Sequence, residues 1–396
     1  MKKPGCWMLL CGTALIMGCA LPLGEDFEIG GGGYARTAAS FAGGGDNSVI
    51  SILEKNKEAT STVEISMSLG LEELTEGINL VYAKGGGDPA NAVDSPRKVL
   101  IDGGGSTLRA ATGNVDPLIT VGGGVELTLQ NITLHGVIGQ SGETVPRKAP
   151  LVKVEAGGKL ILDSGAVLKG NTNSANFSAG GVEVAGTLVM TGTAEISGNT
   201  AMVNSGGGNH SGGGVYVAPG GDFTLIRGTI AENKAIVLGH GMYSAAGVYV
   251  ASGGKFTMEG GSITENKFDA TVQPSWNYFG ATGVFAAGEF AMKGGEITKN
   301  IGGGFSGGVW VERGSSPNDG FTMSGGTITD NESKLSSGGV WIEKGTFIMK
   351  GGTIFDNTTS SSSFRNIDKS SGGLGHFYLE CATLSGGEGT DYCDPD

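Results

Sequence analysis

One motif recurs along most of this 396-residue chain, and the repetition restricts the fold more than any other feature. Gly247–Asn266 is a clear copy: a Gly-Val-aromatic-Val segment, a Phe two places before a Met, an Ile and a closing Asn. The copies, aligned on the first valine, are 33, 33, 36, 25 and 31 residues apart, at Val182, Val215, Val248, Val284, Val309 and Val340. Self-similarity at this period is typical of repeat architectures.

Each copy holds three short runs of period 2 interrupted by glycine, which predicts three strands and three turns. In Val248-Tyr249-Val250 the two valines should face one way and the tyrosine the other. Because no copy has a helical period of 3.6 residues, solenoids of paired helices are excluded.

One copy cannot bury its apolar face alone, but copies stacked in register would bury Phe on Phe, Met on Met and Ile on Ile. The asparagine would stack, or cap a bend that tolerates left-handed backbone geometry. We therefore predict an all-β fold: a right-handed parallel β-helix with about 4.8 Å per rung and about 9–11 rungs. Its repeats are assigned to residues 97–384, followed by a C-terminal tail at 385–396.

Residues 46–96 do not follow the repeat, and we predict that they cap the first rung. Within this cap, Ser48–Glu58 is predicted to form a short helix. Val63–Leu69 and Ile78–Ala83 are predicted to be strands.

Residues 1–18 have the pattern of a lipoprotein signal peptide: a basic start, an apolar core too short to span a membrane, and Gly18 before Cys19. Cys19 is the predicted lipidation site, and the glycine-rich residues 19–45 are a predicted tether. We expect acyl chains such as palmitate to anchor the protein to the bacterial cell envelope, at the outer membrane or cell surface.

The net charge is −13, and loss of Lys2 and Lys3 with the signal peptide would make it −15. This acidity argues against nucleic acid or anionic lipid as a partner. Cys381 and Cys393 lie outside the signal and the anchor, and in an exported protein they could form a disulfide that holds the C-terminal tail.

The recurring Gly-Gly-Val-aromatic-Val and Gly-Gly-x-Ile-x-x-Asn segments resemble the repeats of bacterial polymorphic outer-membrane adhesins. More broadly, they resemble pectin-lyase-like β-helix surface lipoproteins. The adhesins' Phe-x-x-Asn is mostly Ile-x-x-Asn in this chain, as in Ile263-Thr264-Glu265-Asn266. The resemblance implies adhesion to a host or matrix protein or to a glycan.

A first candidate surface is the position between the two valines, which is occupied by Glu183, Tyr216, Tyr249, Phe285, Trp310 and Trp341. On stacked rungs these residues would form an outward row, exposed as a platform for sugar rings or protein partners. The alternatives are a ladder that stabilises the sheet by ring stacking, or a row covered by the N-terminal segment.

A second candidate surface comes from three consecutive long loops, which should protrude together from one edge of the stack. They carry His210, His240, Tyr243, Trp276, Tyr278 and Phe279. These loops would either bind a ligand or form a variable edge without a binding function. His210 and His240 lack a cysteine or carboxylate partner, so we expect no metal site.

Enzymes on pectin-lyase-like folds need clustered carboxylates, and Glu312 and Glu343 are the one such pair, expected about 5 Å apart on adjacent rungs. Because Arg313 and Lys344 follow them, a solvated charge ladder is the preferred interpretation. We therefore predict an adhesin or a binding or structural module without catalysis or cofactor. The alternative is a polysaccharide lyase or glycoside hydrolase.

Overall fold

The computed structural model describes residues 34–39, 62–67, 71–74, 78–80, 97–139, 144–203, 210–237, 242–269, 278–302, 304–360, 366–370 and 375–379. All of them belong to one compact unit, Tyr34–Asp396. They form strands and turns and contain no α-helix. The predicted all-β class is therefore confirmed for the described residues.

The strands form four sheets. The eighteen-stranded sheet contains β1 (Tyr34–Ala39), β2 (Thr62–Met67), β3 (Leu71–Leu74), β5 (Arg97–Ala110), β7 (Val125–His135), β10 (Lys159–Leu162), β11 (Val167–Lys169), β15 (Thr187–Met190), β16 (Glu195–Ser197), β20 (Asp222–Leu225), β21 (Thr229–Ala231), β25 (Lys255–Met258), β26 (Ser262–Thr264), β30 (Glu289–Met292), β31 (Glu296–Thr298), β34 (Gly320–Thr329), β37 (Thr346–Phe355) and β40 (His376–Leu379). The ten-stranded sheet contains β4 (Ile78–Leu80), β6 (Ile119–Val121), β9 (Val152–Val154), β14 (Val182–Val184), β19 (Val215–Val217), β24 (Val248–Val250), β29 (Val284–Ala286), β33 (Val309–Val311), β36 (Val340–Ile342) and β39 (Ile367–Lys369). The eight-stranded sheet contains β8 (Pro146–Arg147), β12 (Thr172–Asn173), β17 (Thr200–Val203), β22 (Lys234–Val237), β27 (Lys267–Asp269), β32 (Ile301–Gly302), β35 (Glu332–Ser333) and β38 (Thr358–Thr359). The four-stranded sheet contains β13 (Ser178–Ala179), β18 (His210–Gly212), β23 (Met242–Ala245) and β28 (Tyr278–Ala281).

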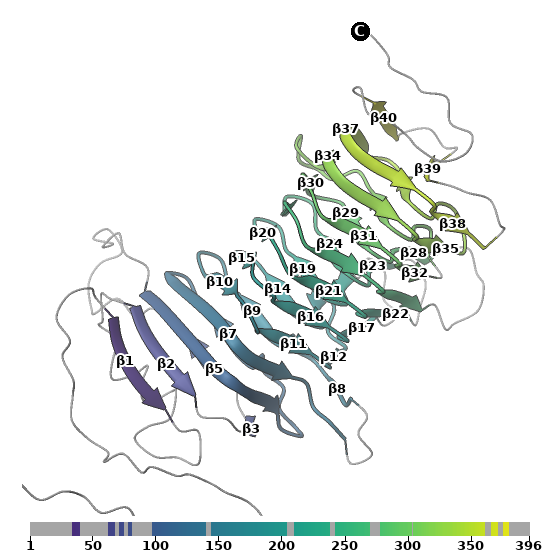
Figure 1. The fold of residues 1–396 in the computed structure, drawn as a ribbon. Helices are drawn as coiled ribbons and strands as arrows, with labels where there is room; N and C mark the ends of the chain where they lie inside the picture. Colours follow the sequence, from purple (N-terminus) through teal and green to yellow (C-terminus); the bar gives the residue numbers. More distant parts are fainter. Residues whose placement is uncertain are drawn as a thin grey trace, which may run out of the picture. The chain divides into compact units, whose positions relative to one another are not determined.

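The chain visits the sheets in a repeating order. One strand of the ten-stranded sheet is followed by two of the eighteen-stranded sheet and one of the eight-stranded sheet, as in β14, β15, β16 and β17. We call such a set a coil. Each strand pairs in parallel with its equivalent in the next coil, Val182 with Val215 and Ile196 with Ile230, for example. Figure 1 shows these strands following one another in order of sequence. Parallel strands stacked in this way are compatible with a β-helix.

The predicted stacking of like side chains is confirmed. The rings of Phe223, Phe256, Phe290, Phe321 and Phe347 are stacked with centroids 4.6–4.9 Å apart and planes 4–11° apart. Met258, Met292, Met323 and Met349 stand opposite one another, as do Ile230, Ile263, Ile297 and Ile328. The valines of the Val-aromatic-Val segments complete this main core.

The closing asparagines form a continuous hydrogen-bonded ladder inside the stack. Asn199, Asn233, Asn266, Asn300 and Asn331 are fully buried. In each, the side-chain Nδ2 and the backbone N–H both donate to Oδ1 of the asparagine one coil on. The left-handed residue is not the asparagine but the one before it, such as Glu265 with φ 56° and Lys299 with φ 56°. Of the two predicted roles of the asparagine, stacking is therefore confirmed, and the left-handed bend lies one residue earlier.

In the segment predicted as the cap, β2 and β3 pair in parallel with β5, and β4 pairs with β6. The predicted strands at Val63–Leu69 and Ile78–Ala83 thus correspond to β2 and β4. The helix predicted at Ser48–Glu58 lies outside the described residues, as do Cys19, Cys381 and Cys393.

Candidate functional site

The row of aromatic residues between the valines, which we call the outer row, runs across the ten-stranded sheet. Tyr216, Tyr249, Phe285, Trp310 and Trp341 are paired in register from one coil to the next. They face away from the main core and form a second apolar cluster, as the alternation predicted. Of the alternatives, an exposed row is wrong, since the exposed fraction is 2% for Tyr249 and 0% for Phe285 and Trp310. A ladder of stacked rings agrees with the structure.

The four-stranded sheet lies against the outer row as far as Phe285, and Phe305 packs edge-on against Trp310, with ring centroids 5.3 Å apart. Its strands β18, β23 and β28 are the final segments of the three long loops, and β13 is the end of the shorter loop before them. Ala179, Ala245 and Ala281, all fully buried, belong to the same apolar cluster as the row. Small side chains allow the two layers to approach closely. The described cover thus comes from the loops, and not from the N-terminal segment.

The rings of the outer row are stacked face to face for most of its length. The centroids of Tyr216 and Tyr249 lie 5.4 Å apart and those of Tyr249 and Phe285 4.8 Å apart, with planes at 15° and 10°. Phe285 and Trp310 continue the stack at 5.5 Å and 18°, and Trp341 then turns to 63° from Trp310. The inner rings therefore present their edges, and not their faces, to anything outside the row.

A second, shorter stack lies beside the first. His210 stacks on Tyr243 with centroids 5.4 Å apart and planes at 12°, and Phe177 lies 5.6 Å from His210 at 40°. The two stacks are joined by a hydrogen bond between the Tyr249 hydroxyl and His210 Nδ1. Tyr243 also meets Phe285 edge-on, at 5.8 Å and 71°.

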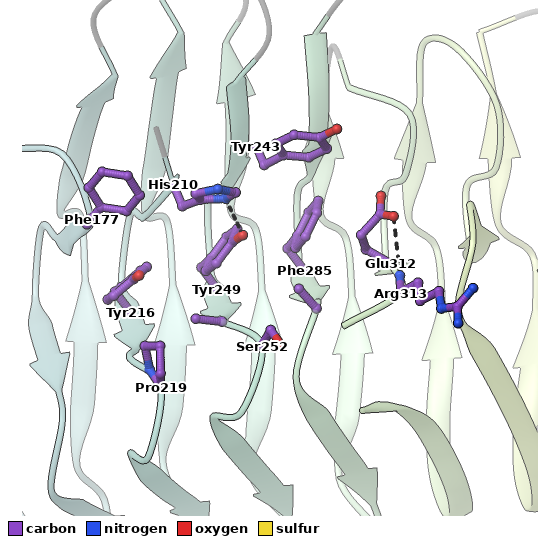
Figure 2. Close-up of a pocket in the computed structure, with 12 residues that line it drawn as sticks. Phe177, His210, Tyr216, Pro219, Tyr243, Tyr249, Ser252, Phe285, Glu312 and Arg313 are labelled. Carbon is purple, nitrogen blue, oxygen red and sulfur yellow. Dashed lines mark hydrogen bonds between the residues drawn. The ribbon is translucent and has the colours of Figure 1, made fainter. Parts of the chain in front are cut away.

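The joined stacks border a groove with a volume of about 430 Å³ (Figure 2). It is lined by both stacks and, at the rim, by Phe177, Pro219, Ala251, Ser252, Ala287, Glu312 and Arg313. The two surfaces predicted separately, the aromatic row and the loop residues, therefore form one site. Trp310 and Trp341 are not among the lining residues.

Glu312 and Arg313 form the polar end of the groove. Glu312 is half-buried, and the Arg313 backbone N–H donates to its Oε1 at 3.2 Å. Burial raises the pKa of Glu312 above its ordinary value, although the Arg313 N–H and the charge of Lys344 act in the opposite direction. The raised pKa favours the protonated form more than in an exposed glutamate.

The other titratable groups of the groove are held neutral near neutral pH. Burial raises the pKa of Tyr216 to about 12, with a contribution from Glu183, and raises those of Tyr243 and Tyr249. Burial lowers the pKa of His210. The groove therefore presents ring edges and uncharged hydroxyl groups, with charge only at the Glu312–Arg313 end.

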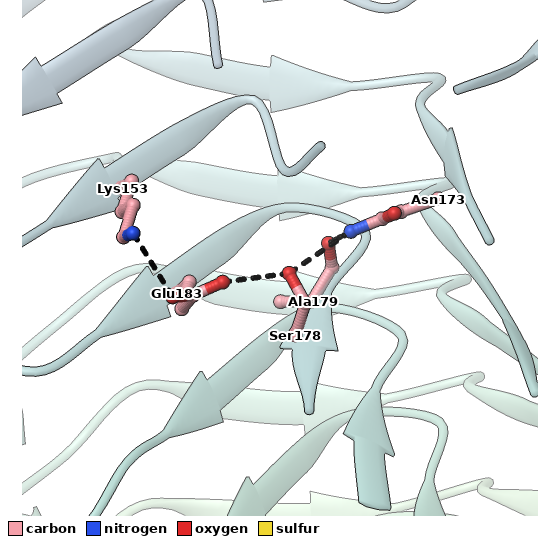
Figure 3. Close-up of polar contacts among 5 residues, drawn as sticks. All are labelled: Lys153, Asn173, Ser178, Ala179 and Glu183. Carbon is pink, nitrogen blue, oxygen red and sulfur yellow. Dashed lines mark hydrogen bonds and ion pairs between the residues drawn. The ribbon is translucent and has the colours of Figure 1, made fainter. Parts of the chain in front are cut away.

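At its N-terminal side the outer row becomes polar (Figure 3). Glu183 occupies the row position before Tyr216, and its carboxylate accepts a 2.7 Å hydrogen bond from Ser178 Oγ and lies 3.9 Å from Lys153 Nζ. Asn173 Nδ2 donates to Ser178 Oγ at 3.0 Å and to the Ala179 carbonyl. This network provides hydrogen-bond partners for the hydroxyl of Ser178, which lies in β13.

Ser211 and Ser244 occupy the position of Ser178 in the next two coils. Both are fully buried, and their hydroxyls have no hydrogen-bond partner in the described part of the chain. Their partners are missing because Asn173 is replaced by Ala201 in the next coil and Glu183 by a tyrosine. The serine therefore recurs in the next two coils, but the hydrogen bonds that Ser178 makes do not.

The other predicted residues are undescribed or make separate contacts. His240 and Trp276 lie outside the described residues, and Tyr278 begins β28 with an undescribed side chain. Trp341 donates from Nε1 to Glu343 Oε2 at 3.0 Å. Within the described ranges there is no group of three His, Cys, Asp or Glu side chains able to hold a metal ion. None of these residues forms a helix long and apolar enough to span a membrane.

Phe177 was missed by the sequence reasoning, although a signal for it exists. Phe177, His210, Tyr243 and Phe279 each stand five residues before a valine anchor, in four consecutive copies. The long loops vary in length only upstream of this position. Aligning the loops from their C-terminal ends would have identified the second stack.

Comparisons with protein families, with curated proteins and with solved structures gave no match to this chain.

Proposed function

We propose that this chain is a surface protein of the bacterial envelope that binds a partner protein through the aromatic groove. One observation carries the proposal: two adjoining stacks of rings, one from the repeat and one from consecutive loops, line the same groove. Insertions gathered on one side of a repeat protein are often its binding face. This function agrees with the adhesins that the repeats resemble.

The supporting scaffold in this proposal is a right-handed parallel β-helix. Its parallel strands recur in register from coil to coil. Crossover connections between parallel strands of one sheet are right-handed in nearly all proteins. The handedness is therefore inferred from this general rule.

The geometry of the rings favours a protein over a glycan as the partner. Sugar rings stack on open aromatic faces, but both faces of Tyr249 are covered by Tyr216 and Phe285. The positively polarised ring edges suit another aromatic ring presented by its face, as well as aliphatic groups. Phe177, with 51% of its surface exposed at the rim, is a suitable contact residue for such a partner.

Substitution of Phe177 tests this function against a matched control. The full chain, Phe177→Ala and Leu335→Ala would be compared for binding to a panel of host matrix proteins and to a glycan array. Leu335 has the same exposed fraction, 51%, and does not line the groove. Phe177→Ala should weaken binding of a protein partner by about 2 kcal/mol, as interface aromatics do, and Leu335→Ala should not. Equal affinity of the two variants for every partner, or partners that are only glycans, would contradict the proposal.

Anchoring through lipid on Cys19 is part of the same proposal and rests on the signal-peptide pattern. Cys19→Ser removes the thiol that would be acylated. The variant should no longer be labelled by radioactive palmitate in cells and should leave the membrane fraction. Undiminished labelling would show that the anchor lies elsewhere.

A second candidate is hydrolysis of a polysaccharide, favoured by the raised pKa of Glu312 beside the charge of Glu343. A protonated carboxyl next to an ionised one is the arrangement of a general acid and its partner. The test is reducing-end release from a polysaccharide panel. If an activity is found, Glu312→Gln should abolish it; no release from any polysaccharide leaves binding as the function.

A further inference from the structure

A second pocket adjoins the groove. It has a volume of about 480 Å³, and Arg313 lines both it and the groove. The other charged or ionisable side chains of this pocket are Lys344, His376 and Asp319. Its lining is rich in backbone and serine atoms, whereas the groove is largely aromatic.

The basic side chains come from three consecutive coils. Arg313 follows β33 by two residues and Lys344 follows β36 by two residues, in strands paired Val311 to Ile342. His376 begins β40, opposite Thr346. Stacking therefore places Arg313 and Lys344 at equivalent positions of adjacent coils, and His376 lines the same pocket, in a chain whose net charge is −13.

Arg313 and Lys344 differ from other cations on the stack. Lys159 pairs with Glu126 at 2.9 Å, and Lys293 with Glu259 at 3.1 Å, each across neighbouring coils. Among the ion pairs of the described residues, none includes Arg313 or Lys344. Lys344 acts on Glu312 only as a nearby charge.

Asp319 is the carboxylate of this pocket, and its oxygens are already engaged. They accept hydrogen bonds from Ser252 Oγ at 2.9 Å, the Gly253 N–H at 3.3 Å and the Ser316 N–H at 2.8 Å. Two further carboxylates lie nearby: Glu343 accepts from Trp341, and Glu312 from the Arg313 N–H. Asp319 thus holds the loop in place, and neither Arg313 nor Lys344 forms an ion pair with it among the described residues.

We infer that this pocket binds a carboxylate of the partner, so that the groove recognises a peptide segment with an aromatic side chain followed by acidic residues. The inference rests on the proposed function. The groove takes the aromatic ring, and Arg313, Lys344 and His376 take the acidic group next to it. Arg313, which borders both pockets, sets the short spacing between them.

The test uses two acetylated, amidated peptide series with fluorescence anisotropy on the full chain. Both series carry one phenylalanine, followed by two glutamates in one series and by two glutamines in the other. The wild type should bind the glutamate series about five-fold more tightly, the gain expected for an exposed ion pair. Lys344→Gln should reduce this ratio by about three-fold. Lys267→Gln, which removes an equal charge from another exposed lysine, should preserve it.

Each outcome separates the two proposals. Equal binding of both series by the wild type, or an equal fall of the ratio in Lys344→Gln and Lys267→Gln, would refute the carboxylate pocket and leave the groove intact. If neither series binds, the peptide groove itself fails. Binding of sulfated or carboxylated glycans that requires Lys344, without binding of either peptide series, would assign the pocket to another partner and overturn the inference.

Discussion

The inner phenylalanine column and the outer row obey the same register but differ in regularity. The inner column keeps one residue type through five coils, with planes 4–11° apart. The outer row passes from Lys153 and Glu183 through tyrosine, phenylalanine and tryptophan to Asp368. Both are buried where they are aromatic. The uniform column builds the scaffold, and three rings of the variable row, Tyr216, Tyr249 and Phe285, line the groove.

The largest expected effect lies in the inner core. Met292→Asp would bury an unpaired carboxylate between Met258 and Met323, at a cost of about 5 kcal/mol or more. Limited proteolysis should then cleave around Phe290–Asn300. Met292→Leu, which conserves volume, should cost less than about 1.5 kcal/mol. Wild-type protease resistance of Met292→Asp would show that this side chain does not face the core.

Trp310→Ala sharpens the comparison in the outer row. An exposed tryptophan would contribute at most about 1 kcal/mol through a cross-strand pair. Because Trp310 is fully buried between Phe285 and Trp341, its loss should cost about 3–5 kcal/mol in denaturant unfolding. A cost near 1 kcal/mol would mean that Trp310 is not buried in solution.

Ser178 and Ser211, which occupy equivalent positions in adjacent coils, allow a matched pair of substitutions. Ser178→Ala removes the donor to Glu183 and should cost about 1–3 kcal/mol. Ser211→Ala removes a buried hydroxyl without a described partner and should be neutral or slightly stabilising, within about 0.5 kcal/mol. Equal costs from thermal melts of the two variants would refute the difference between these coils.

The smallest expected effect is the pH dependence of His210. Burial lowers its pKa in the folded chain below the ordinary 6.5, so below that pH the unfolded chain binds more protons. The stability contribution is therefore present above about pH 6.5 and is lost as the pH falls towards the folded-state pKa. His210→Gln should lose less stability than the wild type between about pH 7.5 and about pH 5.5. An identical fall in both proteins would contradict the burial of His210.

The stacked inner residues could be predicted from the repeat because each of them packs against the same residue type in the neighbouring coils. Phe256 is buried by Phe223 and Phe290, which the sequence repeats at the same place. The burial of Phe285 could not be predicted in this way, because its cover comes from loops of unequal length. The left-handed residue was misplaced for a different reason: Asn266 is a residue type that tolerates this geometry, but its amide is used in the ladder, and Glu265 takes the bend instead.

The asparagine ladder also gives the stack a direction. Every Oδ1 from Asn199 to Asn357 accepts from the preceding coil, so the side-chain carbonyls all point the same way. Among the described residues, the ladder begins at Asn171, whose Oδ1 accepts no hydrogen bond from them, and its last acceptor is Asn366. Between these ends each asparagine makes its ladder contacts with immediate neighbours. A whole coil can therefore be gained or lost there without breaking the pattern, and the molecule can change its length by whole copies of the motif.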